Sequence, residues 1–322
     1  MVLSLFYHLL HLFNQSIKMV LIAVGQICSS AFLAENAKSV IRLINRASNL
    51  GCKVLFLPEA SDYIAKNSNH SKQIVQSIDE SHFIKPIQKQ LKHLNSLGKS
   101  LCISVGVHEP SLNSDRVKNT LLWLNENGEI EQRYQKLHLF DVEISNGPIL
   151  KESLSVEPGM EVLPPFDSPI GKIGAGICYD IRFPELSLRL RSLGAEILLF
   201  PSAFTMKTGA AHWELLARSR ALDTQCFVIM AAQSGKHRTQ TDEELALVGK
   251  EGTIVRESYG HSMVVDPWGT VISQCTDIGS SDSSGSKEDL CLADIDLDKL
   301  KTVRRDMPLW SQRRPDVFGY DV

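Results

Sequence analysis

The sequence predicts an α/β fold in which two β-sheets are covered by helices. Short apolar runs typical of buried strands alternate with segments whose apolar residues recur at helical spacing. Some neighbouring strands are joined by tight turns and others by whole helices, which favours two sheets over a single parallel one. No linker of domain-separating composition interrupts residues 19–322, so we expect them to form one domain.

In the first half of the chain, apolar runs predict strands, and an apolar stripe at helical spacing predicts each helix. Gly98 is expected to end one of these helices, and Asn127-Gly128 predicts a hairpin turn. In order, the expected elements are the strand Val20–Gln26, the helix Ala34–Leu50, the strand Val54–Leu57, the helix Ile84–Leu97, and the strands Leu101–Val107 and Thr120–Asn125.

The second half follows the same alternation. Pro184 is expected in the first turn of a helix that ends at Gly194. In order, we expect the strand Ile173–Ile177, the helix Pro184–Leu193, the strand Ile197–Phe200, the helix Ala211–Thr224, and the strands Phe227–Ala232, His261–Asp266, Val271–Gln274 and Leu290–Asp294. The Ser/Gly/Asp-rich stretch 276–289 is expected to be an exposed hairpin loop. In the charged span 234–257, Asp242–Val248 is expected to form one or two helical turns, and the role of the span stays open.

Cys178 is the first candidate functional residue, because it follows an apolar, glycine-bearing strand directly. A thiol at the carboxyl end of a strand lies where open α/β sheets place their active sites. A lone cysteine is more often a packing residue, but two further residues accompany this one. Glu59 also follows an apolar run, and Lys136 lies among apolar and aromatic neighbours. A nucleophile, a base and a fixed cation together suit thiol-based amide hydrolysis.

The segments around these residues resemble the nitrilase superfamily, the carbon–nitrogen hydrolases. The matching segments are Leu57-Pro58-Glu59-Ala60, Arg116-Val117-Lys118-Asn119-Thr120, Tyr134 to Asp141, Ile177 to Glu185, Ala211-His212-Trp213-Glu214, and Gly260 to Gly269. Segments 136–142 and 178–185 resemble the Nit branch, and segments at Ser202, Trp268 and Trp310 are similar to the fungal deaminated glutathione amidases of that branch. The resemblance implies an α-β-β-α sandwich and a homodimer or higher homo-oligomer.

The resemblance also implies a mechanism. Glu59 would take the proton of Cys178, whose sulfur attacks an amide carbonyl, and Lys136 with the Tyr179 N–H would hold the oxyanion. Water would then hydrolyse the thioester. Glu152 matches a further glutamate of the family, with the task of positioning Lys136 or the substrate, although a solvated loop acid is the other reading. A charged Lys136 is expected to favour the Cys178 thiolate.

The implied substrate is deaminated glutathione, cleaved to 2-oxoglutarate and cysteinylglycine as metabolite repair. An omega-amidase acting on 2-oxoglutaramate and a catalytically silent scaffold stay open as alternatives. A carboxylate-bearing substrate needs cations or hydroxyls, and Arg182, Lys207 and His212 are the candidates. Arg182 has a structural reading as well, in which it holds the turn through Asp180 or Glu185.

Composition limits the function classes. A net charge of −3 gives no indication of a nucleic-acid partner or an anionic membrane surface. Seven cysteines without paired spacing indicate reduced thiols and a cytoplasmic location. No zinc or P-loop motif is present, and we expect neither metal nor cofactor. Residues 1–18 lack acidic residues and arginine and are expected to form a poorly ordered extension. A mitochondrial role for it, and the choice of Met1 or Met19 as the start, stay open.

Overall fold

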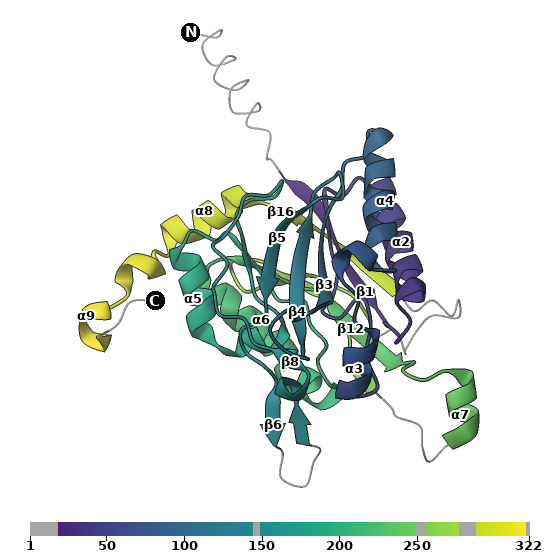
Figure 1. Ribbon diagram of the computed structural model, residues 1–322. Coiled ribbons are helices and arrows are strands. Elements are labelled where there is room, and N and C mark those ends of the chain that lie inside the picture. The colour runs from purple at the N-terminus through teal and green to yellow at the C-terminus, as the bar shows by residue number, and fades with distance from the viewer. Residues whose placement is uncertain (1–18, 144–148, 249–255, 277–287, 320–322) are drawn as a thin grey trace, which may run out of the picture.

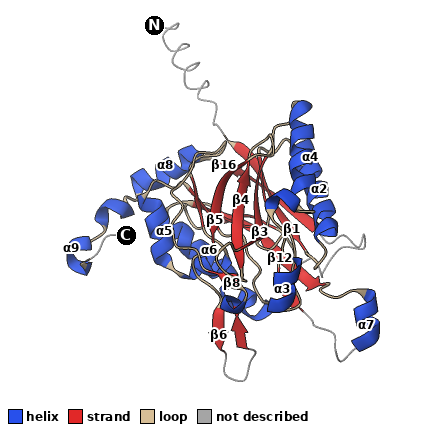
Figure 2. Cartoon of the chain, in the orientation of Figure 1, coloured by secondary structure: helices blue, strands red, loops and turns tan. Residues whose placement is uncertain are grey.

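The structure is a computed structural model that describes residues 19–143, 149–248, 256–276 and 288–319. Two large β-sheets with helices on their outer faces dominate these residues (Figures 1 and 2). The strands of the first sheet are β1 (Val20–Ile27), β2 (Val54–Phe56), β3 (Cys102–Pro110), β4 (Val117–Leu124), β5 (Ile130–Gln135), β8 (Val156–Glu157), β12 (Ala232–His237), β13 (Arg256–Tyr259) and β16 (Glu288–Ile295). The strands of the second sheet are β9 (Ile173–Ala175), β10 (Ile197–Leu199), β11 (Phe227–Met230), β14 (Met263–Val265) and β15 (Val271–Gln274).

Both sheets combine parallel and antiparallel strands. The first sheet runs β13-β12-β1-β2-β3-β4-β5, with β1, β2, β3 and β12 parallel and with β16 antiparallel to β1. In the second sheet, of order β15-β14-β11-β10-β9, the strands β9, β10 and β11 are parallel. Carboxyl ends of parallel strands share one edge of a sheet, so β2 and β9 each deliver the following residues to such an edge.

Helices cover the outer face of each sheet. The helices α2 (Leu33–Asn49) and α4 (Ile84–Ser96) pack through buried aliphatic side chains on the first sheet. The helices α5 (Pro184–Ser192) and α6 (Met206–Thr224) pack on the second sheet, and the main core joins the two sheets. This layering confirms the predicted α-β-β-α sandwich. The remaining helices are α3 (Ser68–Ile74), α7 (Asp242–Val248), α8 (Leu297–Asp306) and α9 (Pro315–Phe318).

Several boundaries differ from those expected. Helix α6 begins at Met206 rather than Ala211, because the Thr205 hydroxyl accepts a hydrogen bond from the Thr208 N–H and caps a turn that lacks an apolar stripe. The ends of the charged span 234–257 are strand, in β12 and β13, while α7 has the predicted bounds. The sequence did not predict α3 or α8. Residues 1–18 and most of the stretch 276–289 lie outside the described residues, and the single domain for 19–322 stays a prediction.

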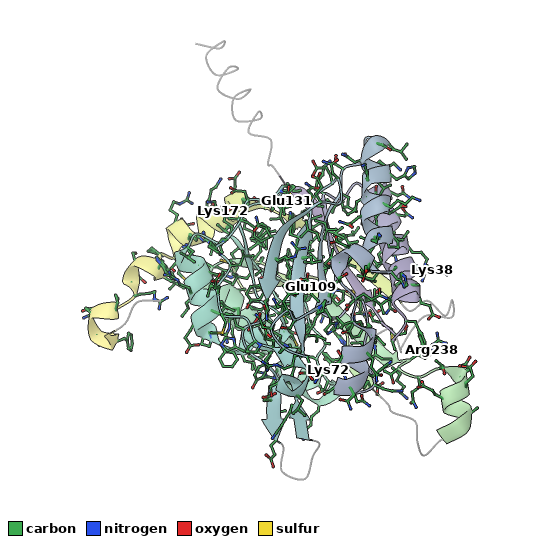
Figure 3. The ribbon with its side chains drawn as sticks, viewed as in Figure 1. Lys38, Lys72, Glu109, Glu131, Lys172 and Arg238 are labelled. Atoms are coloured by element: carbon green, nitrogen blue, oxygen red, sulfur yellow. The ribbon has the colours of Figure 1, made fainter. Side chains whose placement is uncertain are left out.

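Charged side chains generally lie at the periphery, as Lys38, Glu131 and Lys172 show (Figure 3). A buried charge is costly unless it is paired and hydrogen-bonded, so the few ionisable groups inside this protein mark unusual positions. Within the described ranges, no helix has the length and apolar character needed to cross a membrane.

Candidate active site

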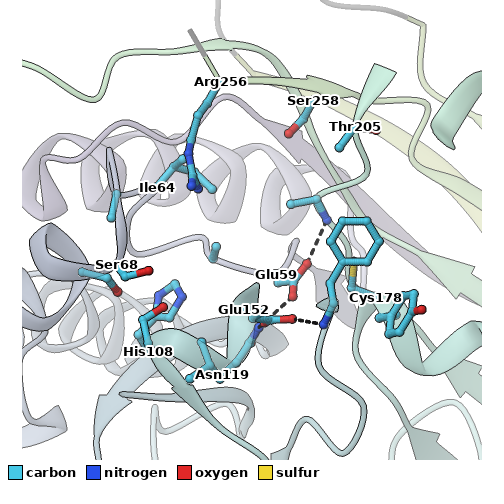
Figure 4. Close-up of a pocket in the computed structure, with 18 of the residues that line it drawn as sticks. Glu59, Ile64, Ser68, His108, Asn119, Glu152, Cys178, Thr205, Arg256 and Ser258 are labelled. Atoms are coloured by element: carbon cyan, nitrogen blue, oxygen red, sulfur yellow. Dashed lines mark hydrogen bonds between the residues drawn. The ribbon is translucent and has the colours of Figure 1, made fainter. Parts of the chain in front are cut away.

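The three candidate catalytic residues meet at one cavity of about 710 Å³, although they are 42 to 119 residues apart in the sequence. Glu59 comes shortly after β2, Lys136 directly after β5 and Cys178 shortly after β9. Figure 4 shows Glu59 between Cys178 and the opposite wall of the cavity. All three are buried, with exposed fractions of 5%, 2% and 8%. The two sheets therefore bring the predicted cluster together.

Cys178 lies on a strained turn. Its φ of 50° is in the left-handed region, which a non-glycine residue seldom occupies, and it begins the 3-10 helix Cys178–Arg182. Its N–H donates to the Pro201 carbonyl at 3.0 Å. The next N–H, that of Tyr179, has no acceptor among the described residues. A free backbone N–H beside the sulfur is positioned to receive an oxyanion.

Asp180 holds this turn in place and is fully buried. Its carboxylate accepts hydrogen bonds from the Ile177 N–H at 2.9 Å, the Tyr134 hydroxyl at 2.7 Å and the His138 N–H at 2.9 Å. It thereby ties the nucleophile turn to the segment on both sides of Lys136. Within the described chain, Arg182 forms no ion pair with Asp180 or Glu185, so no contact supports the turn-holding reading.

The Glu59 carboxylate is held by three donors. Its Oε1 accepts from the Asn119 amide at 2.7 Å and from Lys136 Nζ at 2.9 Å, and its Oε2 accepts from the Ala203 N–H at 3.0 Å. The Cys178 thiol is buried beside the same carboxylate and interacts with it electrostatically. Gly106 on β3 permits this approach, since a Cβ there would lie 2.5 Å from the Glu59 Cα.

Lys136 Nζ is shared by two carboxylates. Besides Glu59 it donates to both oxygens of Glu152, at 3.0 Å each. Glu152 also accepts from the Phe140 N–H at 2.7 Å and from the Asn119 amide at 3.3 Å. Glu152 is thus a neighbour of Lys136, as predicted for a positioning role, and the reading as a solvated loop acid is wrong.

Burial and charge set the protonation states of the cluster. Burial raises the pKa of Glu59, but Lys136 and the surrounding donors outweigh it and hold that pKa below its ordinary value. Burial lowers the pKa of Lys136, but Glu152 and Glu59 outweigh it and raise that pKa well above its ordinary value. At neutral pH the cluster therefore contains a carboxylate base and an ammonium.

Lys136 lowers the pKa of the Cys178 thiol, as expected from its charge, but other groups outweigh it. Burial and the Glu59 carboxylate raise the pKa of the thiol well above its ordinary value, and Lys136 only partly opposes them. The Lys136 ammonium is paired with two carboxylates, and their negative charge weakens its stabilisation of a thiolate. The resting state is thus a neutral thiol next to an ionised base.

Three residues of the site were not predicted as functional. Asn119 bridges Glu59 and Glu152 through its amide nitrogen, and the Ala203 N–H binds the second Glu59 oxygen. Gln233 Nε2 donates to the carbonyls of Glu59 and Ala60 at 3.0 and 3.1 Å, and Ala60 has a φ of 54°. Asn119 lay inside a segment quoted for the family resemblance, which was the available signal. Ala203 also lay in a segment quoted for the resemblance, whereas no sequence signal pointed to Gln233.

The predicted substrate-binding residues differ in their placement. Arg182 lines the cavity, and its guanidinium lies 5.7 Å from the Tyr179 ring centre and 5.6 Å from that of Phe204. His212 Nδ1 lies 3.2 Å from the Arg182 guanidinium and is not itself part of the cavity wall. Lys207 is exposed on the first turn of α6, away from the cavity wall. No cluster of three or more metal-ligating side chains occurs among the described residues.

Comparison with known proteins agrees with this geometry. The family model described as carbon-nitrogen hydrolase matches residues 21–305. The chain belongs to the carbon-nitrogen hydrolase family. This hydrolase is 45% identical over 302 residues to "Probable hydrolase nit2" of Schizosaccharomyces pombe, covering 93% of this chain and 99% of that protein. It is 40% identical over 313 residues to human deaminated glutathione amidase, covering 95% of this chain and 86% of that protein.

The hydrolase is also similar to the solved structure of the Caenorhabditis elegans NitFhit protein. The TM-score is 0.80 at 39% identity, and the match covers 94% of this chain and 66% of that one. The predicted resemblance to the nitrilase superfamily, the fold and the assignment as a hydrolase of carbon–nitrogen bonds are therefore confirmed.

Proposed function

We propose that this carbon-nitrogen hydrolase cleaves deaminated glutathione to 2-oxoglutarate and cysteinylglycine through a thioester on Cys178. The observation that carries the proposal is the buried cluster in which the Glu59 carboxylate contacts both the Cys178 thiol and Lys136. The 40% identity to human deaminated glutathione amidase supports the choice of substrate.

In the proposed reaction, Glu59 accepts the Cys178 proton as the sulfur attacks the amide carbonyl. The oxyanion is stabilised by the Lys136 ammonium and the Tyr179 N–H, the latter having no other acceptor in the described chain. Protonated Glu59 then gives its proton to the departing amine, leaving the acyl group on sulfur. Water attacks this thioester with Glu59 again as the base, which returns the thiol and the acid product.

Arg182 is the proposed ligand for the carboxylate of the 2-oxoglutaryl group. It lies on the cavity wall beside Tyr179, the residue after the nucleophile, and its nearest polar partner is the His212 ring rather than an acid. A guanidinium with free donors binds a carboxylate bidentately. Lys207 is not part of this proposal, since it is exposed and does not line the cavity. His212 contacts Arg182 and would position its guanidinium.

A cavity of about 710 Å³ lies well within the range of pockets that enclose whole small-molecule ligands. That room favours a dipeptide leaving group over the ammonia released from 2-oxoglutaramate by an omega-amidase. The complete cluster of base, cation and thiol gives no support to the silent scaffold.

We further propose a homodimer or higher homo-oligomer. Leu215 and Leu222 are seven residues apart on α6, share one face of it and are 64% and 48% exposed. Trp268, which precedes the Gly269 that lies next to Leu222, is 55% exposed. Neighbouring exposed apolar side chains are typical of subunit interfaces. Light scattering at several concentrations tests this proposal, and a monomer throughout would refute it.

The substrate proposal is tested by comparing kcat/KM for deaminated glutathione, 2-oxoglutaramate and simple nitriles. Deaminated glutathione is expected to be the preferred substrate. A preference for 2-oxoglutaramate would instead indicate an omega-amidase, and no turnover of any amide by wild type would refute the proposed activity.

A further inference from the structure

The proposed reaction leaves one titratable group on the cavity wall without a task. His108 at the end of β3 lines the cavity, and its side chain is only 12% exposed. Its Nδ1 lies 2.9 Å from the Asp62 carboxylate, which also accepts the His108 backbone N–H at 2.8 Å. The imidazole stacks on the Tyr63 ring with a centroid distance of 4.3 Å. The ring is therefore fixed in both position and tilt.

The carboxylate contact decides which proton the imidazole presents to the cavity. A carboxylate can only accept a hydrogen bond, so the His108 Nδ1–H donates to Asp62. Nε2 then remains available to another partner. No residue in the described part of the chain bonds to His108 Nε2. Burial lowers the pKa of His108, but Asp62 and then Glu59 and Glu152 outweigh it and raise that pKa above its ordinary value. With Nδ1–H donated to Asp62, Nε2 donates a hydrogen bond when the ring is an imidazolium, the form that the raised pKa favours.

A second cation lies on the same side of the cavity. Arg256, the first residue of β13, lines the cavity and is solvent-exposed at its rim. Figure 4 shows it beside Ile64, on the side where His108 and Ser68 lie and away from Cys178. No acidic side chain in the described ranges pairs with Arg256, in contrast to Lys66, which is bound to Glu244 at 2.6 Å.

The position of Glu59 shows which part of the substrate faces this wall. Glu59 lies between Cys178 and His108 in Figure 4, and Arg182 lies beside Tyr179 on the side of the nucleophile. The acid that protonates the departing amine must face that amine. With the acyl carboxylate at Arg182, the amine therefore leaves toward His108 and Arg256.

We propose that His108, oriented by Asp62 and Tyr63, forms with Arg256 a subsite for a carboxylate carried by the leaving amine. The inference rests on the proposed amidase function and deepens it, because it explains selection of an anionic leaving group. Cysteinylglycine ends in such a carboxylate, and ammonia has none. Asp62 is a positioning residue in this subsite, since it reaches the substrate only through His108.

Three substrates test the subsite: deaminated glutathione, the same compound with its terminal carboxylate converted to an amide, and 2-oxoglutaramate. Wild type is expected to prefer the acid over its terminal amide by roughly ten- to a hundredfold in kcat/KM, the value of one charge-assisted contact. His108→Gln and Arg256→Gln should each reduce this preference by about tenfold, mainly through KM. Arg133→Gln on β5, a surface arginine outside the cavity wall, is the matched control and should keep the preference.

Equal rates of wild type on the acid and its terminal amide would overturn the subsite and leave the amidase function standing. An equal loss on all three substrates in the His108 and Arg256 variants would show that these residues are only structural, and would also overturn it. If Arg182→Lys alone removed the preference for the terminal carboxylate, the substrate would bind in the opposite direction. Turnover of neither deaminated glutathione nor 2-oxoglutaramate by wild type would refute the proposed function itself.

Discussion

Replacing Lys136 with Met tests how the buried charges depend on one another. The ammonium makes contacts of 2.9 to 3.0 Å with two carboxylates, and Lys136 is 2% exposed. Without it, Glu59 and Glu152 face each other in the interior with no cation between them. Removing one partner of a buried ion pair costs about 3–5 kcal/mol of unfolding free energy. That is a large share of a typical total stability of about 5–15 kcal/mol.

The sign of the pH dependence follows from proton uptake. Without a cation between them, the two buried carboxylates repel each other, and this raises the pKa of one of them. The folded variant therefore binds a proton that the unfolded chain releases. Stability is then greatest at low pH and is lost as pH rises through the raised pKa. Denaturant unfolding should therefore show that the Lys136→Met variant loses more unfolding free energy, relative to wild type, at pH 8 than at pH 5.

A double variant separates charge balance from chemistry. Adding Glu152→Gln to Lys136→Met removes the surplus carboxylate, so stability should largely return. Activity should stay about a hundred- to a thousandfold low, as expected when an oxyanion donor is lost. Lys72→Met is the control, since its ion pair with Asp115 at 2.7 Å is at the surface and outside the cavity wall. If the double variant regained activity together with stability, Lys136 would serve only to neutralise charge.

The remaining predictions concern the thiol, its base and the groups that hold them. Cys178→Ala should fold normally and lose about three to six orders of magnitude in kcat, and retention of a large part of the activity would remove Cys178 from the mechanism. Because the thiol is neutral and Glu59 has a lowered pKa, kcat/KM for 2-oxoglutaramate should be flat from about pH 6 to about pH 9. A steady rise through the ordinary thiol range near pH 8.5 would instead indicate a required thiolate. Asn119→Ala removes a 2.7 Å charge-assisted contact and should move the acid limb upward by about one to two pH units. Asn125→Ala is its control, because that amide also bonds two glutamates but at the surface, and an equal shift there would contradict the assignment. Gly106→Ala should lower both the melting temperature and kcat, since its Cβ meets the Glu59 backbone, and a wild-type melting curve would show that the strand yields easily.

The fold was largely predictable because its strands are apolar runs with clear ends. The helix at Pro184 was found from its proline, and Val54–Phe56 from its length and its polar boundary. Helix α3 was missed because Ser68–Ile74 is polar except for Ile74 and is capped by the Asn67 side chain rather than marked by an apolar stripe. Such short polar helices depend on tertiary contacts that a sequence pattern does not display.

The site was predictable in its composition but not in its electrostatics. Glu59, Lys136 and Cys178 were found because each is a reactive side chain next to an apolar run. Lys136 lowers the pKa of the Cys178 thiol, as expected, but burial and the Glu59 carboxylate outweigh it. That balance depends on contacts among separate segments of the chain, which a sequence pattern does not display. His108 was missed for a similar reason, since its significance lies in the contact with Asp62, 46 residues away in the chain.

In the proposed reaction, one acyl group on one cysteine links substrate to product. The most direct measurement is peptide mass spectrometry of the enzyme quenched with acid during turnover of deaminated glutathione and, separately, of 2-oxoglutaramate. We expect the same added 2-oxoglutaryl group from both substrates, on the peptide containing Cys178 and on none of the six other cysteines. An adduct on another cysteine, or unmodified Cys178 at every quench time while product accumulates, would contradict it.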